Sequence, residues 1–263
     1  MSRHSSHGKE QVIDLTSSPV LKRTRQSSGD FDNKRFQTFL DSQSFTNNFK
    51  SASTVVEKVV RFDTLGSPFM PKIFADKDWA SLFGNFEDPI DKLVKEFYSN
   101  AWFTEVELKC WVRGKDFVIT PNYLEKILHI NHLENVDTPL YDERLALVIE
   151  ILDILGADHE VSFICTSIKT AKFGPEMKIL TLIMFFNLYP LPNTGFINLG
   201  RAQFLCDLIK EAQIDIFAHI FQTMGKTVGR SAARMCLPFC SLAMKIMIFK
   251  GVYLLKEGTT LSC

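Results

Sequence analysis

Two short basic segments combine glycine with lysine, as phosphate-binding loops do. The first is Arg113-Gly114-Lys115, in the run "WVRGKDFVIT", and the second is Gly225-Lys226-Thr227, in "QTMGKTVGR". A phosphate cradle needs several glycines at the start of a helix, so that consecutive backbone N–H groups converge on the anion. The first segment has one glycine between extended stretches, and the second has Ile220 where a P-loop requires its first glycine. We therefore interpret Arg113, Gly114 and Lys115 as a hairpin turn, and the second segment as a loop between helices.

Residues that could hold a metal or act as nucleophiles do not have the spacing of such sites. His129 and His132 lack the His or Cys partners of a zinc site, and Cys236 and Cys240 stand one helical turn apart in an apolar segment. There is no Gly-x-Ser-x-Gly frame, and the spacing of the carboxylates singles out no metal-binding trio. We therefore expect no catalytic residues, no metal and no cofactor, and we predict that the chain is not an enzyme.

The N-terminal stretch carries a short motif that could bind a protein partner. "VIDLTSS" (12–18) has β-prone apolar residues around an acid, followed by serines, as in SUMO-interacting motifs. Such a segment would add as a strand to the edge of a partner's sheet. The predicted SUMO-binding residues are Val12, Ile13, Asp14 and Leu15. Nearby, "LKRTRQ" (21–26) could be a nuclear-import signal or a solvated basic run, so we expect a nuclear or cytoplasmic protein.

Charge is unevenly distributed along a chain whose 30 basic and 30 acidic residues balance. Residues 131–160 contain eight acids and one base, whereas residues 216–256 contain six bases and no acid. The basic end could bind nucleic acid, with Lys226, Arg230 and Arg234 as contacts, or it could pair with the acidic segment of a second copy. We favour solvated or mutually neutralising faces, because aromatic residues are not obviously interleaved with these bases.

The composition is that of a globular protein with an aromatic core. Hydrophobic residues make up 46% of the 263 residues, and 23 residues are Phe. The N-terminus has no apolar signal region, and no uncharged apolar stretch of about 18 residues could form a transmembrane helix. We therefore expect a chain that does not insert into a membrane and whose six cysteines are reduced thiols.

Apolar periodicity predicts a mainly α-helical fold with one small β-hairpin. Residues 1–34 are polar and are expected to form a disordered tail, residues 35–255 a multi-helix domain, and residues 256–263 a short C-terminal tail. The hairpin is predicted where period-two patterning flanks Gly114. The stretch 52–65 is β-branched and fits either a strand or a short helix. Helices are predicted over 34–49, 76–86, 87–102, 120–130, 141–156, 174–190, 200–213, 214–225 and 237–251.

Two of these helices have specific start signals, and one has the composition of a buried element. Asp88 can cap the helix over 87–102, with Pro89 in its first turn, and Thr120 with Pro121 can begin the next helix. The segment 174–190 is almost wholly apolar up to Pro190. We therefore predict it to be the buried central helix of the domain.

Several segments together resemble the family named putative plant transposon protein, a domain of plant retrotransposon-derived open reading frames. They are, in order, "DWASLF", "DKLVKEFYSN", "VRGKDFVITPNYLEKIL", "NLYPLPNTGFINLGRAQFLCDLIKEAQIDI" and "LPFCSLAMKIMIFKGV". The most telling are Glu96-Phe97-Tyr98, the hairpin that follows, and the later "PLPNTGFINLGRA" run. The resemblance spans roughly residues 60–255 and implies an element-encoded or domesticated accessory role, without a reaction, cofactor or catalytic residue.

From the residues and the resemblance together we expect a non-enzymatic interaction domain that contacts protein partners or associates with itself. One alternative is a nucleic-acid-binding accessory protein that uses the basic C-terminal third. A second alternative is a transposase or nuclease remnant.

Overall fold

The computed structural model describes residues 31–75, 77–84, 87–130, 148–156, 167–228 and 236–252. Within these ranges there are nine α-helices and three small sheets that together contain seven strands. The predicted mainly helical fold with a single hairpin is therefore wrong, since the protein mixes α and β structure. The two additional sheets pair very short strands from distant parts of the chain, which leave no local period-two pattern. Both predicted tails, apart from residues 31–34, lie outside the described ranges.

Helices and strands are interspersed along the chain, and each sheet has two or three strands. The antiparallel sheet β2-β3-β4 is formed by β2 (Trp102–Phe103), β3 (Leu108–Val112) and β4 (Lys115–Ile119). Strand β1 (Ser53–Thr54) runs parallel to β7 (Cys236–Leu237), and β5 (Ser167–Lys169) is antiparallel to β6 (Phe196–Asn198). The helices are α1 (Phe39–Ser44), α2 (Phe69–Ala75), α3 (Asp91–Ser99), α4 (Pro121–Leu128), α5 (Val148–Leu155), α6 (Pro175–Ile183), α7 (Leu199–Ile209), α8 (Ile216–Val228) and α9 (Cys240–Phe249).

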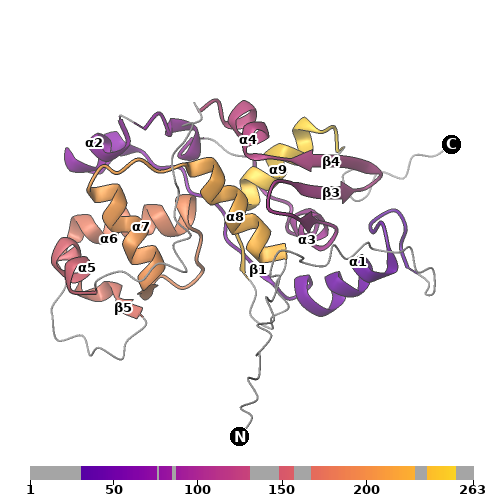
Figure 1. Ribbon diagram of the computed structural model, residues 1–263, viewed down its shortest axis with the longest axis horizontal. Coiled ribbons are helices and arrows are strands. Elements are labelled where there is room, and N and C mark those ends of the chain that lie inside the picture. The colour runs from indigo at the N-terminus through magenta and orange to yellow at the C-terminus, as the bar shows by residue number, and fades with distance from the viewer. Residues whose placement is uncertain are drawn as a thin grey trace, which may run out of the picture.

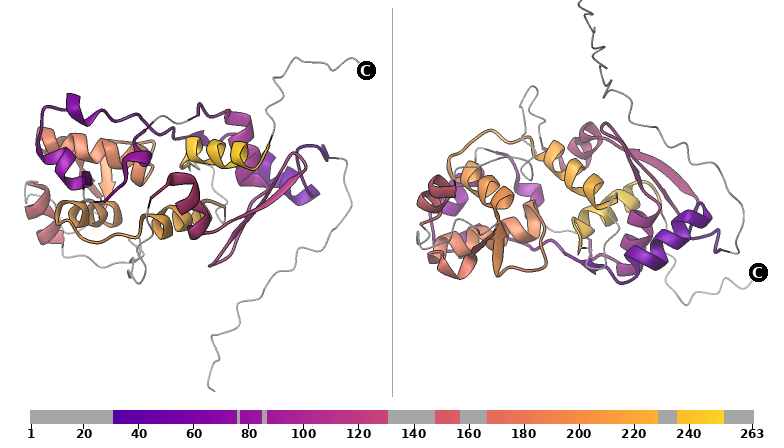
Figure 2. Two further views of the ribbon diagram at one scale, coloured as in Figure 1. Left: turned by 90° about the horizontal axis from the view of Figure 1, so that it is seen from above. Right: turned by 60° about the horizontal axis from the view of Figure 1, so that its bottom comes forward.

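Helix α8 lies between two groups of elements (Figure 1). On one side are α2, α5, α6 and α7 with the β5-β6 pair, and on the other are α1, α3, α4, α9 and the sheet β2-β3-β4. Both views of Figure 2 show the same division. Helix α8 packs against α3, α4 and β2. Helix α8 therefore occupies the middle of this arrangement. The segment 174–190, predicted to be a buried helix, forms α6 and a π-helical turn at Met184–Leu188; its residues Leu180, Phe185 and Leu188 are fully buried, whereas Leu182 is 42% exposed.

Local capping residues decide where two helices next to the sheet begin and end. Thr120 caps α4 as predicted, because its side chain accepts a hydrogen bond from the Tyr123 backbone N–H, and Pro121 is the first helical residue. Helix α3 begins at Asp91, three residues after the predicted cap. It ends at Ser99, where the Asn100 side-chain amide donates to the carbonyl oxygens of Glu96 and of Arg35 in the α1 approach.

The end of α3 corrects the prediction for Trp102. The sequence predicts this residue in the helix over 87–102, whereas it begins strand β2. Its neighbour Phe103 packs against Phe221 of α8, with 5.1 Å between the ring centroids. Strand β2 has only two residues, too few to show the alternation by which a strand is recognised in sequence.

Helix α8 continues through Gly225, Lys226 and Thr227, for which the sequence predicts a loop. Glycine disfavours a helix by about 1 kcal/mol relative to alanine, and this is why the sequence suggested an end there. In the structure Gly225 is buried against β2, and a Cβ atom at this position would lie 2.2 Å from the ring of Phe103. The glycine is therefore a packing residue that lets β2 approach the helix, and no phosphate loop is formed.

The N-terminus of α9 is attached to the extended stretch that follows β1. The buried carboxylate of Glu57 accepts hydrogen bonds from the backbone N–H groups of Ser241 (2.8 Å) and Leu242 (3.0 Å). Burial raises the pKa of Glu57, although these two hydrogen bonds oppose the shift. The stretch 52–65, which fitted strand or helix, thus forms β1, an extended segment and a 3-10 turn at Phe62–Thr64. None of the helices described is both long and apolar enough to cross a membrane.

Candidate interaction surface

The turn between β3 and β4 lies at the residues expected from the sequence. Val112 pairs with Lys115, so Arg113 and Gly114 form a two-residue turn in which both have positive φ, 47° and 83°. This left-handed conformation suits the twist of a tight hairpin and requires no special property of Gly114 beyond its missing side chain. No other residue comes within 4 Å of a Cβ built at Gly114.

The side chain of Arg113 is held by the protein itself. Its Nε donates to a carboxylate oxygen of Glu96 at 3.1 Å, and the other oxygen of Glu96 accepts from the Nε of Arg35 at 2.6 Å. The Glu96 side chain is fully buried, whereas the two arginines are about a quarter exposed. Arg113 therefore serves as a structural contact between the turn and α3. Lys115 is exposed and extends the strand beyond the core.

The sheet β2-β3-β4 has two chemically different faces. Helix α3 packs against β3 and α8 against β2, which covers the inner face. The inner-face residues of β3 are all buried, and so are those of β4 after Lys115. They are Leu108, Cys110, Val112, Phe117 and Ile119. The hairpin lies at the margin of the molecule (Figure 2), so its outer face borders solvent.

The outer face carries two tryptophans and one lysine. Trp102 pairs across the sheet with Lys109, which in turn pairs with Val118, and Trp111 pairs with Asp116. Cross-strand partners share a face, and Trp111 follows Lys109 by two residues, so these five side chains lie on the same side of the sheet. Both tryptophans are partly exposed, and Val118 is 39% exposed. We call this set, Trp102, Lys109, Trp111, Asp116 and Val118, the outer sheet face.

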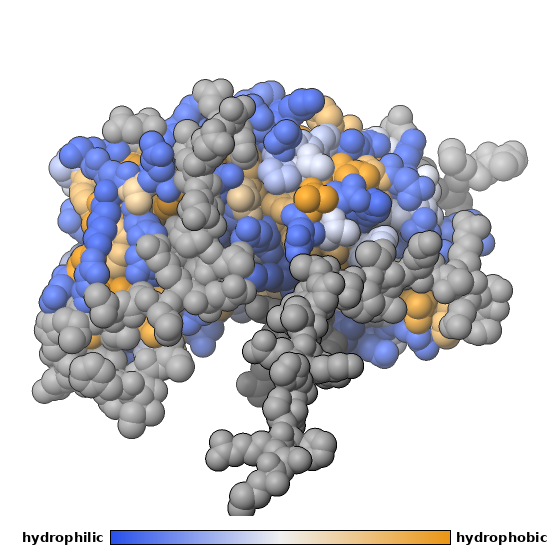
Figure 3. Space-filling model, in the orientation of Figure 1, coloured by the Kyte–Doolittle hydropathy of each residue, from blue (hydrophilic) through white to orange (hydrophobic). Residues whose placement is uncertain are grey.

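A cavity of about 420 Å³ lies against the outer sheet face. Besides the five residues of that face, the cavity is lined by Gln37 and Thr38 of the α1 approach, by Asn100 after α3, and by Cys110 and Phe117, whose side chains belong to the inner face. The Nζ of Lys109 is 5.7 Å from the centroid of the Trp102 ring and 2.7 Å from a carboxylate oxygen of Glu107. On the side of the molecule seen in Figure 3, apolar and near-neutral residues gather where Figure 1 places β3, β4 and α9.

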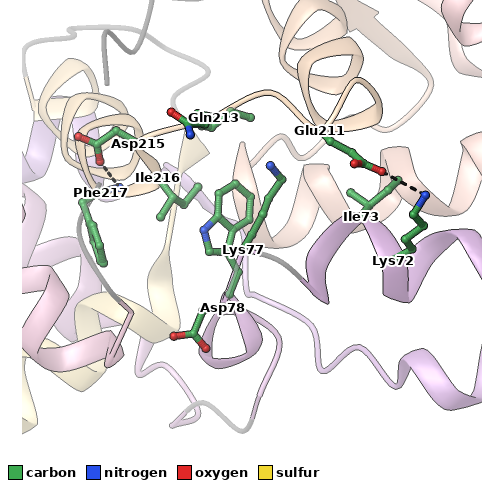
Figure 4. A pocket seen from close by; sticks show the side chains of 11 residues that line it. Lys72, Ile73, Lys77, Asp78, Glu211, Gln213, Asp215, Ile216 and Phe217 are labelled. Atoms are coloured by element: carbon green, nitrogen blue, oxygen red, sulfur yellow. Dashed lines mark hydrogen bonds and ion pairs between the residues drawn. The ribbon is translucent and has the colours of Figure 1, made fainter. Parts of the chain in front are cut away.

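A second cavity, of about 360 Å³, lies between the end of α2 and the connection from α7 to α8 (Figure 4). Several of its polar groups contact other parts of the protein. The Nζ of Lys77 donates to the carbonyl oxygen of Ala212 at 2.8 Å, and Lys72 forms an ion pair with Glu211 at 3.5 Å. Asp215 accepts from the backbone N–H groups at the start of α8. These contacts hold α2 to the α7–α8 connection, so we interpret this cavity as a structural junction.

The described residues do not bring together a reaction centre that we can recognise. Within them, no group of three or more His, Cys, Asp or Glu is arranged to hold a metal. Cys110, Cys206, Cys236 and Cys240 are free thiols. Burial raises the pKa of Cys206 to about 12 and that of Cys236 to about 11, and it raises the pKa of the other two as well. These four cysteines are thus protonated, weak nucleophiles at neutral pH.

The other residues predicted for binding are only partly described. Lys226 is partly exposed near the end of α8, whereas Arg230 and Arg234 lie outside the described ranges. The residues predicted to bind SUMO, Val12, Ile13, Asp14 and Leu15, lie outside them too. From the acidic segment, Glu150 of α5 forms an ion pair with Lys210 at the end of α7.

The outer sheet face was missed at the level of sequence because its members come from three strands. Trp111 and Lys109 alternate visibly with buried residues in β3, and this alternation was the signal available. Trp102 joins them only through the pairing of β2 with β3.

Comparisons with known proteins identify the family of the chain. No curated protein and no solved structure matches it. The sequence model of a family described as "Putative plant retrotransposon-related domain" matches residues 76–253, which include α3 to α9 and the whole sheet β2-β3-β4. This match confirms the resemblance noted in the sequence, and because it covers more than half of the chain, the protein belongs to this family of plant retrotransposon-related domains.

Proposed function

We propose that this chain is a non-enzymatic interaction domain of a plant retrotransposon-derived protein, and that the outer sheet face is its binding surface. The observation that carries the proposal is the placement of Trp102 and Trp111 together on a partly exposed face beside a cavity. Tryptophan is enriched among the residues that contribute most to binding interfaces, because it covers a large apolar area with few rotatable bonds. The buried tryptophan of the chain, Trp79, shows that the core could have accommodated such a side chain.

The test compares the double variant Trp102→Ala/Trp111→Ala with Phe249→Ala, which removes a 66% exposed aromatic ring from α9. Light scattering would measure self-association, and gel shifts would measure oligonucleotide binding, each at low and high salt. We expect one of these activities in the wild-type chain, at least a tenfold loss in the double variant, and no change in Phe249→Ala.

Two results would contradict the proposal. One is binding or self-association that the double variant retains in full while it remains folded. The other is metal-dependent cleavage of a nucleic acid that disappears when a carboxylate is substituted, because it would make the chain an enzyme.

A second candidate is nucleic-acid binding through the basic C-terminal third, with Lys226, Arg230 and Arg234 as contacts. It is supported by the absence of acidic residues from the sequence between 216 and 256. Contacts with phosphates release counterions, so the affinity should fall steeply with salt, and each charge removed should flatten that dependence. A triple substitution to Ala that leaves the affinity and its salt dependence unchanged would exclude this candidate.

The N-terminal motif is a separate proposal for a protein partner. Substitution of Val12, Ile13 and Leu15 by Ala should abolish capture of the chain by immobilised SUMO, because these side chains would fill the partner's groove. Equal capture of the wild-type and substituted chains would rule the motif out.

A further inference from the structure

We propose that the outer sheet face binds single-stranded nucleic acid by stacking unpaired bases on Trp102 and Trp111. This inference rests on the proposed function, because it names the ligand of the same surface. It differs from the basic C-terminal candidate in its chemistry. Here the bases provide the main contact, and phosphates contribute through residues next to the sheet.

The register of the sheet places the two indoles as stacking partners for neighbouring bases. Trp102 is directly opposite Lys109, and Trp111 is two residues further along β3. The indoles are therefore diagonal neighbours, for which Cα atoms are roughly 7–8 Å apart. Aromatic side chains on an open sheet can stack bases of any sequence, because every base has a π face, and each stacked base contributes about 1–3 kcal/mol.

The composition of this surface suits a stacked base better than an apolar protein segment, although Asp116 on the same face would repel a nearby phosphate. Val118 is the one aliphatic residue among the five of the outer sheet face. Lys109 is next to both indoles, directly opposite Trp102 and two residues before Trp111 on β3, and its ammonium is 5.7 Å from the Trp102 ring. Its ion pair with Glu107 is at the surface, with side-chain exposures of 49% and 30%, so it is weak and a phosphate can compete for the lysine.

The sequence that precedes the cavity residues Gln37 and Thr38 is basic. Gln37 and Thr38 line the cavity and follow a stretch that contains Lys22, Arg23 and Arg25. Arg25 precedes Gln37 by twelve residues, which span at most about 40 Å when fully extended. We test this basic run separately from the two indoles, because phosphate contacts of lysine and arginine weaken with salt.

The experiment uses intrinsic fluorescence, because Trp79 is only 3% exposed and the partly exposed indoles are Trp102 and Trp111. The full chain would be titrated with oligothymidylate, with oligouridylate, with an abasic strand of the same length and with a duplex. We expect the two single strands to quench the fluorescence, and the abasic strand and the duplex to bind at least tenfold more weakly. The RNA and DNA strands distinguish the two sources of the same base.

The variants separate stacking from charge. Trp102→Ala/Trp111→Ala should lose at least tenfold in affinity, measured by fluorescence anisotropy of a labelled strand, because two stacked bases contribute more than the 1.4 kcal/mol that corresponds to tenfold. Trp102→Phe/Trp111→Phe should retain much of the affinity, which also controls for misfolding, and Phe249→Ala should retain all of it. Replacing Lys22, Arg23 and Arg25 with Ala should weaken binding and flatten its salt dependence while the preference over the abasic strand persists.

Three outcomes would overturn this inference, and they affect the proposed function differently. Equal binding of the abasic and base-containing strands would mean that charge alone holds the strand. Absence of oligonucleotide binding, with self-association that the Trp-to-Ala double variant loses, would refute the nucleic-acid ligand and leave the interaction surface intact. Oligonucleotide binding and self-association that the double variant retains in full would refute both.

Discussion

The two faces of the sheet β2-β3-β4 are formed by the same strands, but one face is buried and the other is exposed to solvent. Alternate residues of β3 point inward as Leu108, Cys110 and Val112, which are buried, and outward as Lys109 and Trp111, which solvent reaches. The inner residues are the kind that a core requires. The outer face instead leaves two tryptophans partly exposed, an arrangement that folding alone does not require, since water disfavours large apolar surfaces.

The difference suggests that substitutions on the two faces will separate stability from binding. On the inner face a smaller side chain leaves a cavity that the surrounding helices cannot fill. On the outer face a smaller side chain leaves space for water, so the cost in stability is small and the cost in binding is large.

The largest effect on stability is expected at Ile119 in β4, for which the adjacent Val118 is the matched control. Ile119 is fully buried and Val118 is 39% exposed on the opposite face. Ile119→Ala should lower the free energy of unfolding by about 2–5 kcal/mol. Val118→Ala should change it by less than about 1 kcal/mol, since exposed positions contribute little. Urea unfolding followed by circular dichroism measures both, and losses of similar size would show that the sheet does not have one covered face.

A smaller loss is expected at the contact between the inner face and α8. Gly225→Ala should destabilise the chain by about 1–3 kcal/mol, because the new methyl group would overlap the ring of Phe103. The sign of this change in the free energy of unfolding is informative, since Gly→Ala in an unobstructed helix stabilises by about 1 kcal/mol.

A matched background tests the cause of the Gly225 effect. When Phe103→Ala removes the ring first, Gly225→Ala should become neutral or stabilising. A penalty that persists in this background would mean that the glycine is required for a reason other than its contact with β2.

Local patterns predicted the parts of this fold that depend on neighbouring residues. The β3–β4 hairpin was recognisable because alternation flanks Gly114, and the start of α4 because Thr120 and Pro121 stand next to each other. The pairs β1-β7 and β5-β6 were not recognisable, because each joins strands of two or three residues from distant parts of the chain. The end of α8 was mispredicted for a related reason. Gly225 is accommodated in the helix because it packs against Phe103, which is far away in sequence.

The candidate site was harder to predict than the fold, because it depends both on local sequence patterns and on contacts between residues that are far apart in sequence. The turn residues Arg113, Gly114 and Lys115 were located correctly, but they do not belong to the proposed binding surface. That surface requires β2, and the sequence assigned Trp102 to the preceding helix. A tertiary contact of Asn100 ends that helix, through its hydrogen bond to the carbonyl oxygen of Arg35.

The smallest of the expected effects concerns the two basic residues of the turn. Arg113 donates to the buried carboxylate of Glu96 at 3.1 Å, and Lys115 is exposed at the start of β4. Arg113→Ala should cost about 1–2 kcal/mol, since a charge-assisted hydrogen bond is lost from a side chain that remains 26% exposed and partly screened. Lys115→Ala should leave the stability unchanged within error.

Unfolding in urea at low and at 1 M salt provides the check, together with a double-mutant cycle. The loss for Arg113→Ala should shrink when Glu96→Gln has already removed the negative charge. Because Arg113 is directed toward α3 and the bases are proposed to stack on the opposite side of the sheet, Arg113→Ala should leave the preference for base-containing over abasic strands unchanged. If that preference disappeared with Arg113 alone, the basic turn would have to be assigned to the binding surface, and the separation of the two faces would fail.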